Sequence, residues 1–310
     1  MPMAPHTRLI SVCICTFRRP DGLRRALESA FALQIPSGCT LELLVVDNDA
    51  SGSASTVVDS FRAFTTEIRS LRYVNEPTPG VSHARNRCLE SAAGEMLAFF
   101  DDDEFVKPDW LVELLACTDR TQADAVFGPV LPSFEIPPTP WALASGVHDR
   151  QRFPSGTVLP WREARTGNVA LRRSMLAGGH RFSTEFARTG GEDSLFFATA
   201  QSQGRKLVWC DEAIVHESVP AQRMEPTWIL HRAFMGGRTY VRLEARLGHR
   251  LPYTTFALRG LVASVVSLAT VAALYLRGDA RHVRHLCRLY GHLGKIMARF
   301  YSYGPYAGDA

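Results

Sequence analysis

One apolar segment followed directly by acidic residues constrains this chain more than any other feature. Met96–Phe100 is an unbroken apolar run with the length of a strand that is buried on both faces. Three aspartates, Asp101 to Asp103, and then Glu104 follow at once. Because side chains alternate along a strand, we expect Asp101 and Asp103 to point to one side and Asp102 to the other.

These adjacent carboxylates repel one another, so a cation or solvent has to offset their charge. Oxygen ligands at the carboxyl end of a buried strand suit Mg²⁺ or Mn²⁺ with a phosphate attached. A solvated acidic turn before the helix expected at Pro108 would explain the same residues, since a helix N-terminus also favours negative charge. The segment by itself leaves both interpretations open.

Strands and helices alternate through the first 128 residues. Apolar runs predict strands, and apolar spacing with a proline or glycine near the start predicts helices between them. The expected strands are 9–15, 41–46, 71–74, 96–100 and 125–128, and the expected helices are 20–30, 56–67, 80–93 and 108–118. This rhythm predicts an α/β fold with a doubly wound, mostly parallel sheet. Ligands bind beyond the carboxyl ends of such strands, which here are residues 16–18, 47–49 and 101–103.

The periodicity fails between residues 131 and 161, where prolines are dense. A long irregular segment inside a domain is usually functional or mobile. Its two tryptophans, Trp141 and Trp161, suit stacking on sugar faces or filling the core. Beyond it we expect a strand at 166–171, short helices at 172–176 and 194–200, and strands at 206–209 and 213–215.

Three polar residues in these segments have two interpretations each. Asp47 follows a strand and either accepts a hydrogen bond from a base or ribose or stabilises the Asp-Asn-Asp turn. Asp193 precedes a helix after two glycines and is either a general base or an N-cap. His216 is expected at the end of a strand, where a histidine is more often a surface residue than a metal ligand.

The charge is distributed unevenly along the chain. Residues 221–303 hold thirteen arginines and lysines against three acids, a net +10, although the whole chain carries only +4. The rest of the chain therefore carries −6. A basic tail on an acidic body suggests a polyanionic surface, either membrane or nucleic acid. The seven cysteines lack metal-ligand spacing, and no signal-peptide pattern opens the chain, so we expect reduced cytosolic thiols.

Six short motifs follow one another along the chain: Thr16–Pro20, Val46–Asp49, Ala84–Asn86, Phe100–Glu104, Gly167–Asn168 and Gly191–Asp193. Taken in this order, they resemble the inverting glycosyltransferases of family 2, which have the GT-A fold. The resemblance covers roughly residues 8–245 and is greatest to the bacterial exopolysaccharide glucosyltransferases of the succinoglycan type. No Gly-x-Gly-x-x-Gly or Walker loop is present, so a glycine loop does not hold a nucleotide here.

The resemblance implies a role for each matching residue. Thr16, Arg18 and Arg85 would border the nucleotide, and Asp47 would contact uracil. Asp101 and Asp102 would lie at the ribose or sugar. Asp103, in the DxD motif, and His216 would hold Mg²⁺ or Mn²⁺ on the diphosphate. Asp193 would be the catalytic base with Glu192 beside it, and Arg223 would stabilise the departing UDP.

The implied reaction moves a sugar, expected to be glucose, from a UDP-sugar to a lipid-linked saccharide in exopolysaccharide or cell-surface glycan synthesis. The chain lacks the Gln-x-x-Arg-Trp segment of processive synthases, which favours single additions and leaves the role of Arg223 open. A nucleotidyltransferase and a catalytically inactive nucleotide-sugar-binding membrane protein are the alternatives. A nucleotidyltransferase should have a glycine-rich phosphate loop after the first strand, and residues 16–20 contain no glycine.

The C-terminal part predicts membrane attachment. Gly260–Leu276 carries no charge over 17 residues, slightly short of a full span. An apolar stripe follows from Val283 to Phe300, with basic residues on the opposite face. We therefore expect a catalytic domain at 1–222 and a helical segment at 223–310 that binds the membrane through 256–303, as a peripheral or monotopic protein on the cytoplasmic face of the bacterial inner membrane. A helical hairpin packed on the catalytic domain or on a second copy in a homo-oligomer is the alternative, and no nucleic-acid motif is present.

Overall fold

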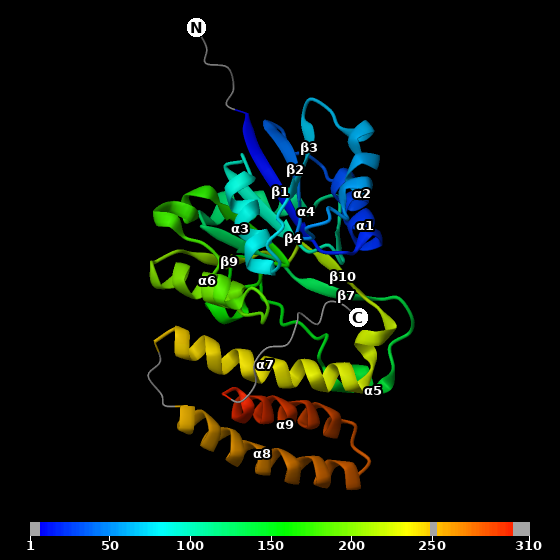
Figure 1. Ribbon diagram of the computed structural model, residues 1–310, viewed down its shortest axis with the longest axis vertical. Helices are drawn as coiled ribbons and strands as arrows, with labels where there is room; N and C mark the ends of the chain where they lie inside the picture. Colours follow the sequence, from blue (N-terminus) through cyan, green and yellow to red (C-terminus); the bar gives the residue numbers. More distant parts are fainter. Residues whose placement is uncertain (1–6, 249–252, 300–310) are drawn as a thin grey trace. The chain divides into compact units, whose positions relative to one another are not determined.

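The structure is a computed structural model that describes residues 7–248 and 253–299 (Figure 1). The chain forms two compact units. The first comprises residues 1–131, 150–188 and 192–217, and the second comprises 132–149, 189–191 and 218–310. The predicted division at 222 is close to the last of these boundaries, but residues 132–149 and 189–191 belong with the C-terminal unit. The predicted pair of domains, 1–222 and 223–310, remains a prediction.

The first unit is built on a seven-stranded sheet with the order β3-β2-β1-β4-β8-β6-β9. The strands are β1 (Arg8–Thr16), β2 (Cys39–Asp47), β3 (Arg69–Asn75), β4 (Met96–Phe100), β6 (Ala125–Phe127), β8 (Asn168–Arg172) and β9 (Leu207–Trp209). β3, β2, β1 and β4 are parallel, and β8 runs antiparallel to both β4 and β6. The predicted mostly parallel sheet is confirmed, and its antiparallel member is β8.

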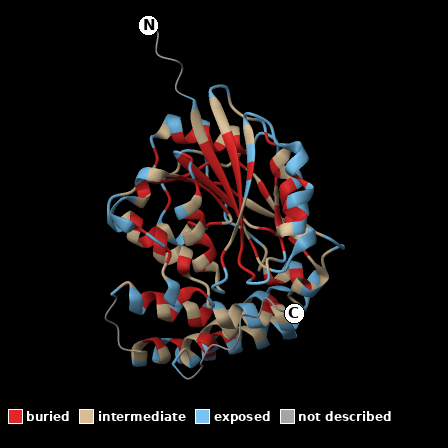
Figure 2. Ribbon diagram, turned by 45° about the horizontal axis from the view of Figure 1, so that its top comes forward, coloured by how far each residue is buried: buried red, intermediate tan, exposed pale blue. Residues whose placement is uncertain are grey.

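Helices cover both faces of this sheet, which is what buried strands require. One face carries α1 (Pro20–Phe31), α2 (Ser55–Ser60) and α4 (Trp110–Thr121), and the other carries α3 (Val81–Ser91) and α6 (Glu192–Ser202). All five residues of β4 are buried, as the apolar run predicts, and the central strands are buried along most of their length (Figure 2). The fold is therefore doubly wound, with one apolar core on each side of the sheet.

The expected helix at 56–67 is wrong in its length. α2 ends at Ser60, and a 3₁₀ turn at Arg62–Phe64 follows it. The rings of Phe61 and Phe64 pack on Phe31 of α1, with ring centroids 5.5 and 6.1 Å from it. This tertiary packing, which local periodicity does not encode, turns the chain before the helix can continue.

A three-stranded sheet has the order β5-β10-β7. Its strands are β5 (Glu104–Val106), β7 (Val130–Phe134) and β10 (Val215–Val219). The segment 131–161, expected to be irregular, thus includes part of β7 and also α5 (Pro140–Ser145). The strand expected at 213–215 instead begins at Val215, so His216 lies inside a strand and not at its end.

The second unit is dominated by α7 (Pro226–Arg246), α8 (Tyr253–Leu276) and α9 (Arg281–Met297), with α9 packed against both of the others (Figure 1). Glycines allow close approach between α7 and α9. A Cβ at Gly237 would collide with the carbonyl of Gly291, and one at Gly294 with that of Phe234. Small residues at such a contact are typical of helices that pack backbone to backbone.

Candidate active site

The carboxyl ends of β1, β2 and β4 meet at one edge of the sheet, because these strands are parallel and adjacent. Thr16 is in register with Asp47, and Asp102 follows β4. The Thr16 hydroxyl donates a hydrogen bond to Asp102 over 2.8 Å. The polar strand ends that the sequence predicts as a ligand-binding edge are thus brought together.

The predicted alternation of the three aspartates is wrong. β4 ends at Phe100, and residues 102 and 103 form a turn, so the strand's period of two does not continue. Arg19 instead bonds both Asp102 and Asp103, at 3.1 and 3.2 Å. Asp102 is buried, and burial raises its pKa to about 6 although Arg19 acts in the opposite direction. It holds Thr16 and Arg19 in place.

Asp47 is fully buried and organises its own loop. Its carboxylate accepts hydrogen bonds from the backbone N–H groups of Asp49 (3.0 Å) and Ala54 (2.8 Å) and from the Tyr73 hydroxyl (2.9 Å). Burial, followed by the bond to Asp47, raises the pKa of Tyr73 to about 12. These contacts give Asp47 a turn-stabilising role in the structure, and its contact with uracil remains a prediction.

Arg18 has an unusual backbone for a residue with a side chain. Its φ is 52°, in the left-handed region, which costs about 1–2 kcal/mol for a non-glycine residue. Its guanidinium donates to Asp49 at 3.3 Å, and 60% of the side chain is exposed. Backbone strain of this kind is often found at functional sites, and the place of Arg18 beside a nucleotide remains a prediction.

Arg85 connects the end of β4 with the start of α6. Its guanidinium pairs with Glu192 and lies 3.4 Å from Asp101. The side chain is only 8% exposed. Burial favours its neutral form, but the carboxylates of Glu192 and Asp101 outweigh this effect and raise the pKa of Arg85. Arg85 thereby holds two predicted site segments together, although it was predicted only at the edge of the nucleotide.

Asp193 is the second residue of α6 and does not occupy the usual position of an N-cap. Its Oδ1 accepts a bond of 2.6 Å from the N–H of Ser194, the next residue, whereas a cap usually bonds the N–H two or three residues ahead. Glu192 beside it is buried, and burial raises the pKa of Glu192 although Arg85 opposes this. The half-buried Asp193 is the more accessible of the two carboxylates.

Five carboxylates gather around the turn after β4, those of residues 101–104 and of Glu217. Burial raises the pKa of Asp101, and repulsion from Asp103 and Glu217 raises it further, although Arg85 lowers it. Burial also raises the pKa of Glu104, and Asp101 and Asp103 add to this shift. Glu104 accepts the backbone N–H of Asp101 at 2.6 Å. Mutual repulsion among oxygen donors is what a divalent cation would relieve, so this donor set fits Mg²⁺ or Mn²⁺.

His216, the second predicted metal ligand, packs on an aromatic ring. β10 pairs antiparallel with β5, with His216 opposite Phe105 and Glu217 opposite Glu104. Opposite residues share a face of the sheet, so Glu217 and Glu104 lie on one face and His216 on the other. The His216 ring stacks on Phe105 with 5.2 Å between centroids, and burial followed by Lys107 lowers its pKa. The strand pairing thus directs Glu217 to the acidic side.

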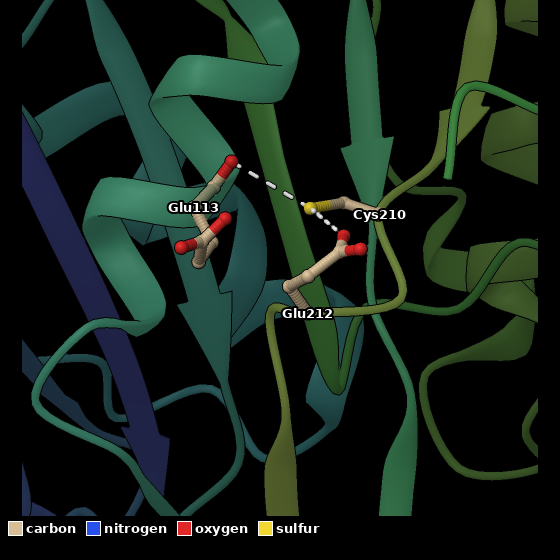
Figure 3. Close-up of side chains that lie close together, drawn as sticks. All are labelled: Glu113, Cys210 and Glu212. Atoms are coloured by element: carbon tan, nitrogen blue, oxygen red, sulfur yellow. Dashed lines mark hydrogen bonds between the residues drawn. The ribbon is translucent and has the colours of Figure 1, made fainter. Parts of the chain in front are cut away.

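A separate group of ligand atoms comes from Glu113, Cys210 and Glu212 (Figure 3). Within residues 7–248 and 253–299, it is the one set of three such atoms within 4.8 Å of one another. Burial raises the pKa of Cys210 to about 12. In the structure the Cys210 thiol donates a hydrogen bond to a carboxylate oxygen of Glu212 over 3.6 Å, so an ion is not needed to explain why these side chains lie close together.

Arg223 lies in the second unit. Its backbone carbonyl is 3.3 Å from the ring of His148, and its guanidinium is 5.9 Å from the centroid of Trp228. Its predicted role at the leaving group remains a prediction. Sequence reasoning missed Arg19 and Glu217, and the only signals were the second arginine of the Arg-Arg pair and the glutamate after His216.

Solved structures of the same fold include two glycosyltransferases. The mannosyltransferase PcManGT from Pyrobaculum calidifontis, in complex with GDP-Man and Mn²⁺, aligns with a TM-score of 0.63 over 94% of this chain and 87% of that chain, at 18% identity. S. aureus TarS residues 1–349 in complex with UDP align with a TM-score of 0.55 over 94% of this chain and 91% of that one, at 17% identity. These likenesses show the GT-A fold that the sequence predicts.

The family model described as "Glycosyl transferase family 2" matches residues 11–175. The chain belongs to this family and is a glycosyltransferase. It is 36% identical to the succinoglycan biosynthesis protein ExoM of Rhizobium meliloti over 95% of this chain and 94% of that protein. It is 24% identical to a glucosyl-dolichyl phosphate glucuronosyltransferase of Haloferax volcanii over 74% of this chain and 75% of that protein. The nucleotidyltransferase alternative is excluded.

Proposed function

We propose that this glycosyltransferase moves a sugar, expected to be glucose, from a UDP-sugar to a lipid-linked saccharide during synthesis of an exopolysaccharide or a related cell-surface glycan. Similarity to a succinoglycan biosynthesis protein supports the pathway class. A relative named for action on a glucosyl-dolichyl phosphate supports a lipid-linked acceptor. The structurally similar TarS was solved with UDP, which supports the nucleotide.

The observation that carries the proposed mechanism is the position of Arg85 between Asp101 and the Glu192–Asp193 pair. Asp193 takes the proton of the acceptor hydroxyl while the oxygen of that hydroxyl attacks the anomeric carbon. The bond from that carbon to the diphosphate oxygen breaks, UDP leaves, and attack from the opposite side inverts the anomeric configuration. Arg85 neutralises Glu192, so that Asp193 is the carboxylate available as a base.

A divalent cation fits the acidic cluster after β4. Asp103 would hold it as predicted, and Glu217 is the better-placed second ligand because it shares a face with Glu104. His216, the predicted partner of Asp103, stays a candidate. When bound, Mg²⁺ or Mn²⁺ supplies charge neutralisation on the diphosphate. Arg19, which bonds Asp102 and Asp103, sets the position of the turn.

The membrane attachment that the sequence predicts is proposed to occur through α8, at the cytoplasmic face of the inner membrane. By length and composition, α8 is the one helix in the described part of the chain that could cross a membrane. Its buried positions are Phe256, Gly260, Ser264 and Ser267, whereas Leu261, Val265 and Leu268 are more than half exposed. A helix that turns its small and hydroxyl side chains to protein and its leucines outward suits lipid as its solvent.

The apolar stripe of α9, unlike the outer face of α8, is largely covered by protein. Val283 is buried, and Leu286, Cys287 and Tyr290 are half-buried, so the second unit covers much of this stripe. α9 therefore packs within the second unit, against α7 and α8. Packing of a helical hairpin on the catalytic domain or on a second copy stays a prediction, and α8 is the proposed lipid contact. Phe300, at the end of the predicted stripe, lies outside the described residues.

The test is transfer from labelled nucleotide-sugars to lipid. Purified protein is incubated with Mn²⁺, a lipid extract containing the acceptor, and either UDP-glucose or GDP-mannose as the matched control. We expect UDP release and label in the lipid fraction with UDP-glucose, and neither above background with GDP-mannose. Label from GDP-mannose alone would overturn the assignment of UDP, and label that stays water-soluble would overturn the lipid acceptor.

A further inference from the structure

The space between α8 and α9 is a groove with two chemically different walls. Its volume is about 630 Å³. Leu258, Val262 and Val266 line it from α8 at a spacing of four residues, which places them on one face of that helix. A hydrocarbon chain lying along this apolar strip would be removed from water where it contacts these three side chains.

The opposite part of the groove is basic. His285, Arg288 and His292 line it from α9, and Arg259 lines it from α8. In the described part of the chain no acidic residue lines the groove, and neither α8 nor α9 contains one. A guanidinium is the donor that best matches a phosphate, through paired N–H groups.

The arginines of α9 differ in their pairing. Arg281 pairs with Asp279 at 2.6 Å, and Arg284 pairs with Asp149 at 2.7 Å. Among residues 7–248 and 253–299, neither Arg288 nor Arg259 has a carboxylate partner. The two arginines in the groove therefore keep their charge available for a ligand, while the two beside it are neutralised within the protein.

We propose that this groove binds an anionic phospholipid of the membrane, with the phosphate between Arg259 and Arg288 and an acyl chain along Leu258, Val262 and Val266. The proposal rests on the membrane attachment through α8 given above. Charge complementarity selects an anionic amphiphile, because a free phosphate would leave the apolar wall uncovered and a neutral lipid would leave the arginines without a partner. The protein would thus prefer membranes rich in such lipids.

The experiment measures binding of the full-length protein to two kinds of vesicle, phosphatidylcholine alone and phosphatidylcholine with one quarter phosphatidylglycerol. The groove variant is Arg259→Gln/Arg288→Gln, and the matched control is Arg281→Gln/Arg284→Gln, which removes the same number of charges. We expect the groove variant to lose about tenfold or more of its affinity for the anionic vesicles and the control to lose about twofold or less. Arg259→Lys/Arg288→Lys should restore part of the loss.

Further measurements distinguish a specific lipid site in the groove from other causes of a loss in affinity. Equal losses in both glutamine variants would mean general surface attraction and would overturn the groove. Displacement from anionic vesicles by millimolar inorganic phosphate, at unchanged ionic strength, would mean a free-phosphate site instead of a lipid site. Sugar transfer in detergent should be equal in all variants. If the native protein binds neither kind of vesicle, the proposed membrane attachment and the proposed lipid site both fail. If the native protein prefers anionic vesicles but does not transfer sugar, only the proposed reaction fails.

Discussion

The strand β4 and the helix α8 are both rich in apolar side chains, but β4 buries these side chains whereas α8 exposes many of them. Every residue of β4 is buried, and the charged groups that follow it are held by partners such as Arg85 and Arg19. On α8, by contrast, Val265 is 62% exposed while Ser264 is 7% exposed. The first pattern is what water imposes on a folded chain, and the second fits a helix whose outer face meets lipid.

The contrast also concerns charge. Around β4, the carboxylates are buried or half-buried and lie beside arginines, an arrangement that is costly without such partners and is common where chemistry is done. Around α8 and α9, acids are absent from both helices and the basic groups are half-buried or exposed. We infer that the acidic edge of the sheet is the place of reaction and that the basic helices are the place of attachment.

The largest expected effect is at the acidic turn. Asp103→Ala removes the proposed cation ligand and should lower turnover about 10³-fold or more, since a metal stabilises the leaving diphosphate by several kcal/mol. The measurement is initial rate against Mn²⁺ concentration, with Asp59→Ala on the surface as control. If the Asp103 variant keeps both its rate and its metal dependence, the ligand assignment is wrong.

A matched pair of substitutions tests whether apolar side chains are buried in the sheet and exposed on the outer face of α8. Val45→Thr, in the fully buried part of β2, should lower the free energy of unfolding by about 2 kcal/mol, because it buries a hydroxyl in the core. Val265→Thr on the outer face of α8 should change it by less than about 0.5 kcal/mol in detergent. Urea titration measures both. An equal loss in the two variants would mean that protein covers the outer face of α8.

The smallest expected effect is the pH dependence contributed by Glu192. The folded state raises its pKa from 4.5 to about 7, so its contribution to stability is full below about pH 4.5 and is lost as the pH rises through about 7. Between pH 5 and 8 the native protein should therefore lose stability relative to Glu192→Gln, by on the order of 1 kcal/mol. Unfolding curves measured at several pH values check this, and parallel profiles would contradict it.

Local patterns predicted those parts of the fold in which one segment determines its own structure. The apolar run of β4 is predicted at its observed bounds, and the helix at Pro20 begins at that residue. The antiparallel direction of β8 could not be predicted, because direction depends on how the chain returns to the sheet. The turn at residues 101–103 overrode strand alternation, since the strand ends where the apolar run ends.

The candidate site shows the same limit. Residues next to strand ends, such as Thr16 and Asp102, are predictable from order along the chain. The pairing of Arg85 with Glu192 joins positions 107 apart in sequence, and the pairing of Glu217 with Glu104 depends on the register of two short strands. Contacts of this range follow from the assembled fold and not from local sequence.

The substitution Asp193→Asn tests whether Asp193 is the base of an inverting sugar transfer. The amide keeps the shape of the side chain but cannot take the acceptor proton, so single-turnover transfer should fall about 10²-fold or more. Binding of UDP-sugar, followed by calorimetry, should change by less than about threefold, and the melting temperature should hardly change. A variant that transfers sugar at the native rate would remove Asp193 from the mechanism.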